Sequence, residues 1–149
     1  RISNEGFYYV PHLLKGSTDI SGHQHQPSHI KKVIREYDPK HYELVKRSMK
    51  KVISHPDGTG HYYFQNRPYS AAGKTGRTQV TSHHSQRADA PIPKHLENHS
   101  LFIGYAPVDH PQVVVVTIVE NSELSAATVS RKILDFYFKH MVNNDEIKL

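Results

Sequence analysis

Apolar residues recur at helical spacing over residues 38–54. Asp38 and Pro39 are a favourable N-cap and first-turn pair, and they predict a helix that begins there and ends near Ser54. The side chains that share its apolar stripe are Tyr42, Val45, Met49, Val52 and Ile53. We therefore expect one amphipathic helix in this part of the chain.

A second helical pattern closes the chain. It begins near Ser122 or Ser125 and ends near His140. The buried stripe predicted for it consists of Val129, Ile133, Phe136 and Tyr137. Residues 143–149 read as a polar tail.

Between the two helices the pattern is that of β-strands. The Asp-Gly-Thr-Gly stretch at 57–60 predicts a tight turn, and three strands are predicted at 73–82, 99–107 and 113–119. The third strand is so uniformly apolar that we expect it to be central in a sheet and covered on both faces.

The connections between these strands are short, at 83–98 and 108–111, and short connections favour antiparallel neighbours. The order of elements predicts an α+β fold, an antiparallel sheet of at least three strands with the C-terminal helix packed on it. Residues 1–36 read as mostly irregular. They include a short strand or extended entry at 7–10, a mobile loop at 16–28 and an extended or helical piece at 30–36.

Composition limits the possible classes. The 149 residues suit one domain, and an apolar share of 36% is low for a self-contained core. A start at Arg1 indicates a fragment. No apolar run predicts a membrane span or a signal peptide, and the absence of cysteine excludes disulfides and thiolate metal sites. The net charge is +5, but the sequence contains no basic helix with interleaved aromatic residues. We therefore expect no nucleic-acid partner.

The 13 histidines raise the question of a metal site. Structural zinc takes four ligands, and neither cysteines nor a His-Glu-x-x-His frame is present. We interpret the following histidines as solvated loop residues: His23, His25, His29, His83, His84, His95 and His99. We therefore expect no metal site.

Lys74-Thr75-Gly76 carries the most specific chemistry. Such a triplet at the start of a strand is one of three motifs of serine enzymes that are acylated by D-Ala-D-Ala peptides or β-lactams. The ammonium and hydroxyl groups suit a carboxylate, and glycine lets a ligand lie against the backbone. The N–H of Arg77 is placed to be an oxyanion donor. Along a strand, Thr75 and Arg77 share one face, and Lys74, Gly76 and Thr78 the other.

Four stretches together resemble a known family. They are Val10 to Leu13; His55 to Gly60 with Tyr63 and Phe64; Ala71 to Val80; and Leu101 to Pro107 with the valine strand, Glu120-Asn121 and Arg131 to Asp135. In order and spacing they are similar to the C-terminal part of the transpeptidase domain in the penicillin-binding protein 2 family, the class B D,D-transpeptidases of rod-shape elongation.

The resemblance implies a partial serine transpeptidase/β-lactamase-like fold. It also implies that the parent protein cross-links peptidoglycan stem peptides through a serine acyl-enzyme and binds penicillins. Lys74, Thr75 and Gly76 carry over as the third active-site box, so Lys74, Thr75, Gly76, Arg77 and Thr78 are the predicted substrate-binding residues. The resemblance places the parent in the periplasm, held in the bacterial inner membrane by an anchor outside this chain. It implies no cofactor.

Two departures from the family pattern stand out. The family usually has threonine or serine where this chain has Arg77, so a guanidinium replaces a hydroxyl near the substrate carboxylate. It could strengthen the ion pair with the carboxylate or crowd the site. The second departure is Ser122-Glu123 in place of Gly-Gly, which concerns only the turn and the helix cap.

The nucleophile box is missing from a usable position. Ser28 and Ser48 each begin a Ser-x-x-Lys match, but no Ser-x-Asn lies between Lys51 and Lys74. We therefore expect a fragment that is inactive alone and that self-associates through an exposed apolar sheet face and an unpaired edge. The alternatives are a non-catalytic peptidoglycan-binding or interaction domain, and a small hydrolase that uses Ser48.

Overall fold

The computed structural model describes residues 2–33, 37–80, 92–122 and 124–142. They form two compact units, one within residues 1–45 and one within residues 46–149. Within the described ranges, we find no helix with the length and apolar character that a membrane crossing requires. The predicted polar tail at 143–149 lies outside the described residues.

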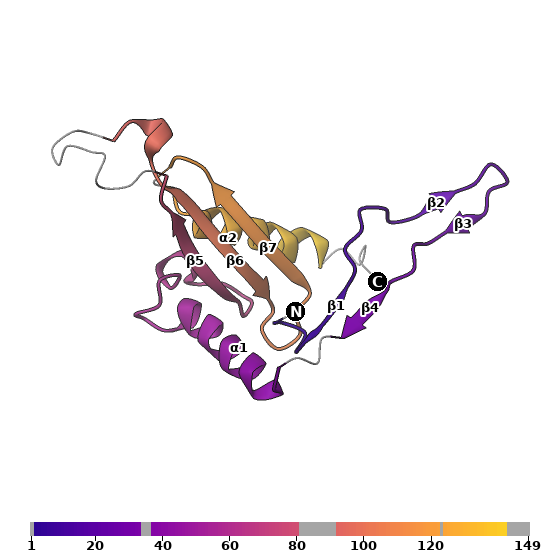
Figure 1. Ribbon diagram of the computed structural model, residues 1–149, viewed down its shortest axis with the longest axis horizontal. Helices are drawn as coiled ribbons and strands as arrows, with labels where there is room; N and C mark the ends of the chain where they lie inside the picture. The colour runs from indigo at the N-terminus through magenta and orange to yellow at the C-terminus, as the bar shows by residue number, and fades with distance from the viewer. Residues whose placement is uncertain (1, 34–36, 81–91, 123, 143–149) are drawn as a thin grey trace. The chain divides into compact units, whose positions relative to one another are not determined.

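The first unit contains two small antiparallel ladders (Figure 1). β1 (Phe7–Tyr9) pairs with β4 (Lys31–Val33), and β2 (Ser17–Thr18) pairs with β3 (Gln24–His25). The strand predicted at 7–10 is confirmed, and so is the extended form of the next piece over 31–33.

The loop predicted at 16–28 is wrong in its centre, because β2 and β3 form a hairpin there. The hairpin turn is closed by Asp19, whose carboxylate accepts the backbone N–H groups of Ser21 and His23 at 2.9 Å each. The bond from His23 is the main reason that the pKa of Asp19 lies below its ordinary value. Polar composition alone did not reveal that one aspartate organises this turn.

The helix α1 (Pro39–Ser54) begins where the sequence predicts. Asp38 Oδ1 accepts the N–H of Lys40 at 2.9 Å, as an N-cap residue does. The predicted apolar stripe is confirmed at its C-terminal end, where Ile53 is fully buried. Val45, by contrast, is 40% exposed.

The turn after α1 folds back on the helix. The N–H of Gly58 bonds to the carbonyl of His55 at 2.8 Å, and that of Gly60 bonds to the carbonyl of Val52 at 2.9 Å. A Cβ atom on Gly58 would lie 2.3 Å from the Val52 carbonyl oxygen, so only glycine fits this approach. The turn predicted at 57–60 is therefore confirmed, and it fixes where Thr59 lies.

The second unit contains a sheet of three antiparallel strands in the order β5-β6-β7 (Figure 1). The strands are β5 (Ala72–Thr78), β6 (His99–Ala106) and β7 (Val113–Val119). β5 ends at Thr78, whereas the first strand is predicted to extend to residue 82. Residues 81 and 82 lie outside the described residues. The predicted α+β fold, with an antiparallel sheet and a C-terminal helix, is confirmed.

The prediction that the valine strand is central and doubly covered is wrong for the described sheet. β6 is the central strand, and β7 lies at the edge. Val114, Val116 and Ile118 are 61%, 65% and 59% exposed. Strand composition indicates two covered faces, but among the described elements only α2 packs against β7, on the face of Val115 and Thr117.

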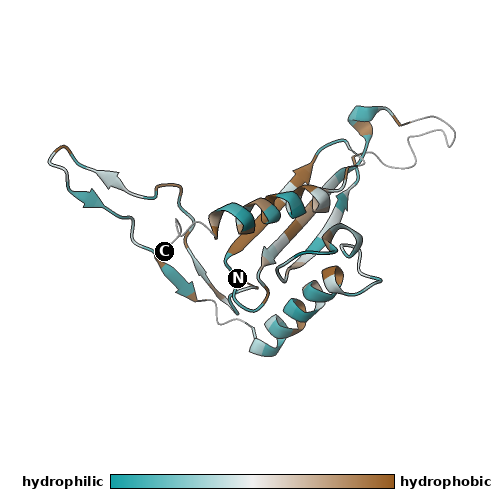
Figure 2. Cartoon of the chain, turned by 180° about the vertical axis from the view of Figure 1, so that it is seen from behind, coloured by the Kyte–Doolittle hydropathy of each residue, from teal (hydrophilic) through white to brown (hydrophobic). Residues whose placement is uncertain are grey.

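The helix α2 (Ala126–Phe136) continues into a short π-helical turn, η4 (Tyr137–Met141). Its buried residues are Ala126, Ala127, Ser130 and Leu134, so the predicted stripe is wrong. Ile133 and Phe136 are 46% and 61% exposed. Three of these four side chains are small and allow α2 to approach the sheet closely, and Ser130 Oγ and Thr117 Oγ1 lie 2.7 Å apart in a hydrogen bond. Figure 2 shows the hydrophobic strands behind this helix.

The core of the second unit is centred on two stacked aromatic rings. Phe64, at the end of the short helix η1 (Tyr62–Phe64), stacks on Phe102 of β6 with ring centroids 5.3 Å apart. Leu134 of α2 and Ile53 of α1 belong to the same buried cluster. This core fixes β5 and β6 relative to α2 and the turn after α1.

A partly buried polar network links the chain before β5 to α2. The Tyr69 hydroxyl donates to Asp135 Oδ1 at 2.7 Å, and Arg131 Nε donates to both oxygens of that carboxylate at 2.7 Å. Arg131 Nη1 also donates to the carbonyl of Gln65 at 2.7 Å. Burial, followed by the bond to Asp135, raises the pKa of Tyr69 above its ordinary value.

We expect Tyr69→Phe to lower the free energy of unfolding by about 1–2 kcal/mol, because the Asp135 carboxylate loses a donor. Since the fold raises the pKa of Tyr69, the Tyr69 contribution is fully present below the ordinary tyrosine pKa of about 10 and declines as the pH rises above it. Urea unfolding at two pH values measures both effects. Tyr62→Phe, at a side chain that is 79% exposed, is the control, and an equal loss in both variants would contradict the prediction.

Candidate active-site wall

The Lys74-Thr75-Gly76 triplet lies in the middle of β5. Cross-strand pairs set which side chains share a face: Thr75 lies opposite Phe102, and Arg77 lies opposite Ser100. Thr75 and Arg77 therefore share the face on which α2 packs, and Lys74 belongs to the other, as the sequence predicts. In the described sheet the far edge of β5 carries no further strand, so its backbone is open to an extended ligand.

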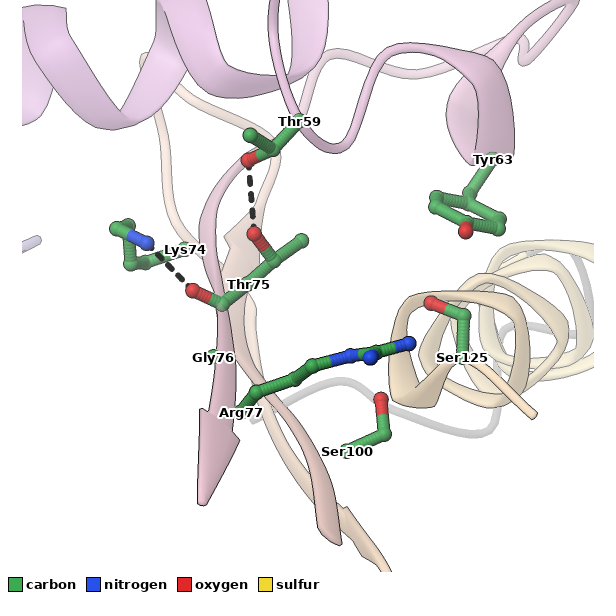
Figure 3. Close-up of a pocket in the computed structure, with 8 residues that line it drawn as sticks. All are labelled: Thr59, Tyr63, Lys74, Thr75, Gly76, Arg77, Ser100 and Ser125. Atoms are coloured by element: carbon green, nitrogen blue, oxygen red, sulfur yellow. Dashed lines mark hydrogen bonds between the residues drawn. The ribbon is translucent and has the colours of Figure 1, made fainter. Parts of the chain in front are cut away.

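A cavity of about 360 Å³ lies along β5 (Figure 3). Its lining residues come from the turn after α1, η1, β5, β6 and the N-cap of α2. They are Thr59, Tyr63, Lys74, Thr75, Gly76, Arg77, Ser100 and Ser125. Polar side chains predominate, as suits a site for a charged and hydrogen-bonding ligand.

Thr75 is held by a neighbouring hydroxyl. Its Oγ1 lies 2.7 Å from Thr59 Oγ1, and either hydroxyl can be the donor (Figure 3). The Lys74 ammonium folds along the strand and donates to the carbonyl of Thr75. A cation and an oriented hydroxyl therefore both line the cavity.

Lys74 also lines a second cavity of about 460 Å³. Ser48 and Lys51, on neighbouring turns of α1, line the same cavity, together with His55 and Asp57. His55 Nδ1 lies 3.6 Å from Asp57 Oδ2. The structure thus places the second Ser-x-x-Lys match closer to Lys74 than sequence separation suggests.

No group of three or more His, Asp or Glu side chains among the described residues is arranged to hold a metal ion. His23 and His25 each approach Asp19 at 3.3 Å, and both are exposed. Each of these pairs is an exposed hydrogen bond of the hairpin turn. His83 and His84 lie outside the described residues.

The structure brings Lys74, Thr75, Gly76 and Arg77 together around one cavity. Thr78, the fifth predicted residue, is exposed at the end of β5 and does not line it. Sequence reasoning missed Tyr63, Ser100 and Ser125, and it read Thr59 only as part of a turn. Ser100 could have been found from strand pairing, because register places it opposite Arg77.

Comparison with known proteins decides the family. Residues 1–135 match the penicillin binding protein transpeptidase domain. The chain belongs to this family. It is 36% identical over 143 residues to the peptidoglycan D,D-transpeptidase MrdA of Escherichia coli K12, covering 89% of this chain and 22% of the relative. Against MrdA of Haemophilus influenzae it is 32% identical over 139 residues, covering 90% and 21%. The chain thus spans about a fifth of the length of these curated relatives.

Solved structures of penicillin-binding proteins share the fold of this transpeptidase-family chain. Penicillin-binding protein 2 of Pseudomonas aeruginosa, in complex with WCK 5153, aligns with a TM-score of 0.65 at 24% identity, over 97% of this chain and 29% of that one. The D,D-transpeptidase domain of a peptidoglycan glycosyltransferase from Eggerthella lenta gives 0.70 at 22% identity, over 94% and 30%. At these identities the likeness establishes the fold.

Proposed function

We propose that this chain is the C-terminal part of the transpeptidase domain of a peptidoglycan D,D-transpeptidase, and that it supplies one wall of the active site. The observation that carries the proposal is the placement of Lys74 and Thr75 on the open edge of β5, beside a polar cavity, in a chain of the transpeptidase family.

In this proposal the nucleophilic serine comes from a part of the parent outside these residues. The Lys74 ammonium attracts the carboxylate of a stem peptide or a β-lactam, the Thr75 hydroxyl donates to it, and the exposed edge of β5 pairs with the peptide backbone. The Arg77 N–H serves as an oxyanion donor. The chain alone is inactive. The parent acts in the periplasm, is anchored in the inner membrane and contributes to cell shape.

Two alternative functions lead to different expected results of penicillin labelling. A hydrolase that uses Ser48 is favoured by one observation, that Ser48, Lys51 and Lys74 line a common cavity. A non-catalytic stem-peptide-binding domain uses the β5 cavity without any acylation. The first is covalently labelled by penicillin as an isolated chain, and the second is never labelled.

A chimera tests the proposal. Residues 1–135 replace the matching segment of the Escherichia coli relative, and the product is treated with a fluorescent penicillin. We expect the chimera to be labelled and the isolated 149-residue chain to remain unlabelled. A folded chimera that takes up no label would contradict the proposal.

We further propose that the isolated chain self-associates through β7. Val114, Val116 and Ile118 expose apolar surface beside a strand edge that carries no partner in the described sheet. Val116→Lys is expected to shift the chain toward monomer in sedimentation velocity at high concentration, because it places a charge on this face. Glu120→Lys, at an exposed residue just after β7, is the control. A monomeric wild-type chain would overturn this proposal.

A further inference from the structure

Arg77 and Lys74 place two cations on different sides of the β5 cavity. Figure 3 shows the Arg77 side chain extending from β5 toward Ser125 at the start of α2, with Ser100 beside it. Lys74 lies on the other side of Thr75 and donates to the Thr75 carbonyl. If a single small anion binds at Lys74 and Thr75, the Arg77 guanidinium therefore stays available to a second anionic group.

The two serines beside Arg77 can each donate a hydrogen bond from the hydroxyl group. Ser100 Oγ accepts the N–H of Ala126 at 2.8 Å, and Ser125 Oγ accepts the N–H of Ala127 at 3.2 Å. Each amide bond uses an oxygen lone pair and leaves the hydroxyl proton for another acceptor. Because both side chains line the cavity, an acceptor beside Arg77 can receive these protons.

The charge around Arg77 favours an anion. The residues that line the cavity include neither aspartate nor glutamate, and no ion pair joins Arg77 to any of the described residues. A guanidinium presents a planar fork of donors that fits a carboxylate through two parallel hydrogen bonds. Arg77 therefore offers the cavity a site for a carboxylate.

We propose that Arg77, Ser100 and Ser125 form a second carboxylate-binding subsite, separate from Lys74 and Thr75, and that the cavity selects peptides that carry two carboxylates. This inference deepens the proposed function and rests on it for the peptide nature of the ligand. The guanidinium binds one carboxylate, the two serine hydroxyls complete its hydrogen bonds, and Lys74 and Thr75 bind the other.

The test compares two isosteric peptides on the 149-residue chain. N-acetyl-D-alanyl-D-glutamate has two carboxylates, and N-acetyl-D-alanyl-D-glutamine has one. Titrations followed by ¹H–¹⁵N NMR give both affinities, and the Arg77 Nε–Hε resonance, assigned by its loss in Arg77→Gln, reports contact directly. We expect the glutamate peptide to bind about tenfold tighter and to move that resonance.

Two charge-matched variants complete the test. Arg77→Gln and Lys132→Gln each remove one exposed positive charge, but Lys132 lies on α2 and does not line the cavity. We expect Arg77→Gln to abolish the preference for the glutamate peptide and Lys132→Gln to keep it. Equal affinities in the wild-type chain, including no binding of either peptide, would overturn the inference, and so would an equal preference in the two variants.

This inference and the proposed function fail separately. If the chimera takes up penicillin while the wild-type chain binds both peptides equally, the second subsite is refuted and the transpeptidase assignment stands. If the chain prefers the glutamate peptide through Arg77 while a folded chimera remains unlabelled, the subsite stands and the transpeptidase assignment is refuted.

Discussion

Lys74→Ala is expected to lower the rate constant for penicillin acylation of the chimera by about 10²–10³-fold, the usual effect of removing one electrostatic stabiliser from an active site. Lys74 and Thr75 both line the β5 cavity, where the ligand carboxylate and the developing negative charge are proposed to lie.

The rate constant for acylation of Lys74→Ala is measured from the time course of labelling at several penicillin concentrations. Lys132→Ala in the same chimera is the control, since it removes an exposed lysine that does not line this cavity. Lys74 is itself exposed, so its replacement leaves the core unchanged. Equal rates for the two variants would show that Lys74 takes no part in the reaction.

Phe102→Ala is expected to lower the free energy of unfolding of the 149-residue chain by about 3–5 kcal/mol. The Phe102 side chain is 2% exposed and stacks on Phe64. Its ring also fills the space that Gly73 and Gly104 leave: a Cβ atom there would lie 2.4 and 2.6 Å from the ring. Alanine would leave a cavity between β5, β6 and η1 that the backbone cannot fill.

Urea unfolding followed by circular dichroism measures this loss, with Phe136→Ala as the control. Phe136 is 61% exposed on α2, so its replacement should cost much less. Because Gly73 directly precedes Lys74, we also expect Phe102→Ala to disorder the start of β5. Similar losses for both variants would contradict the packing described for this core.

The sequence predicted those elements that local rules determine. Asp38 and Pro39 mark the start of α1, and the glycines at 58 and 60 mark the turn that ends it. The motif around Lys74 led to β5 and, by the alternation of side chains along a strand, to the face that Arg77 shares with Thr75. For these elements, residue type and spacing were sufficient to predict the structure.

The predictions were wrong where contacts between residues distant in the sequence determine which side chains are buried. The four valines of β7 indicate a central strand, but whether both faces are covered depends on elements that composition does not specify. On α2, Ser130 and the two alanines face the sheet in place of the larger Ile133 and Phe136, because a close approach to the strands favours small residues. Ser125 joins the cavity only because α2 begins beside β6, which no local pattern shows.

We propose that this chain supplies one wall of the site and that the nucleophile lies elsewhere in the parent. Mass-spectrometric mapping of the penicillin adduct on the chimera tests it most directly. We expect a single penicilloyl group on a serine in the part contributed by the Escherichia coli relative, and none on residues 1–135. An adduct on Ser48 would contradict it.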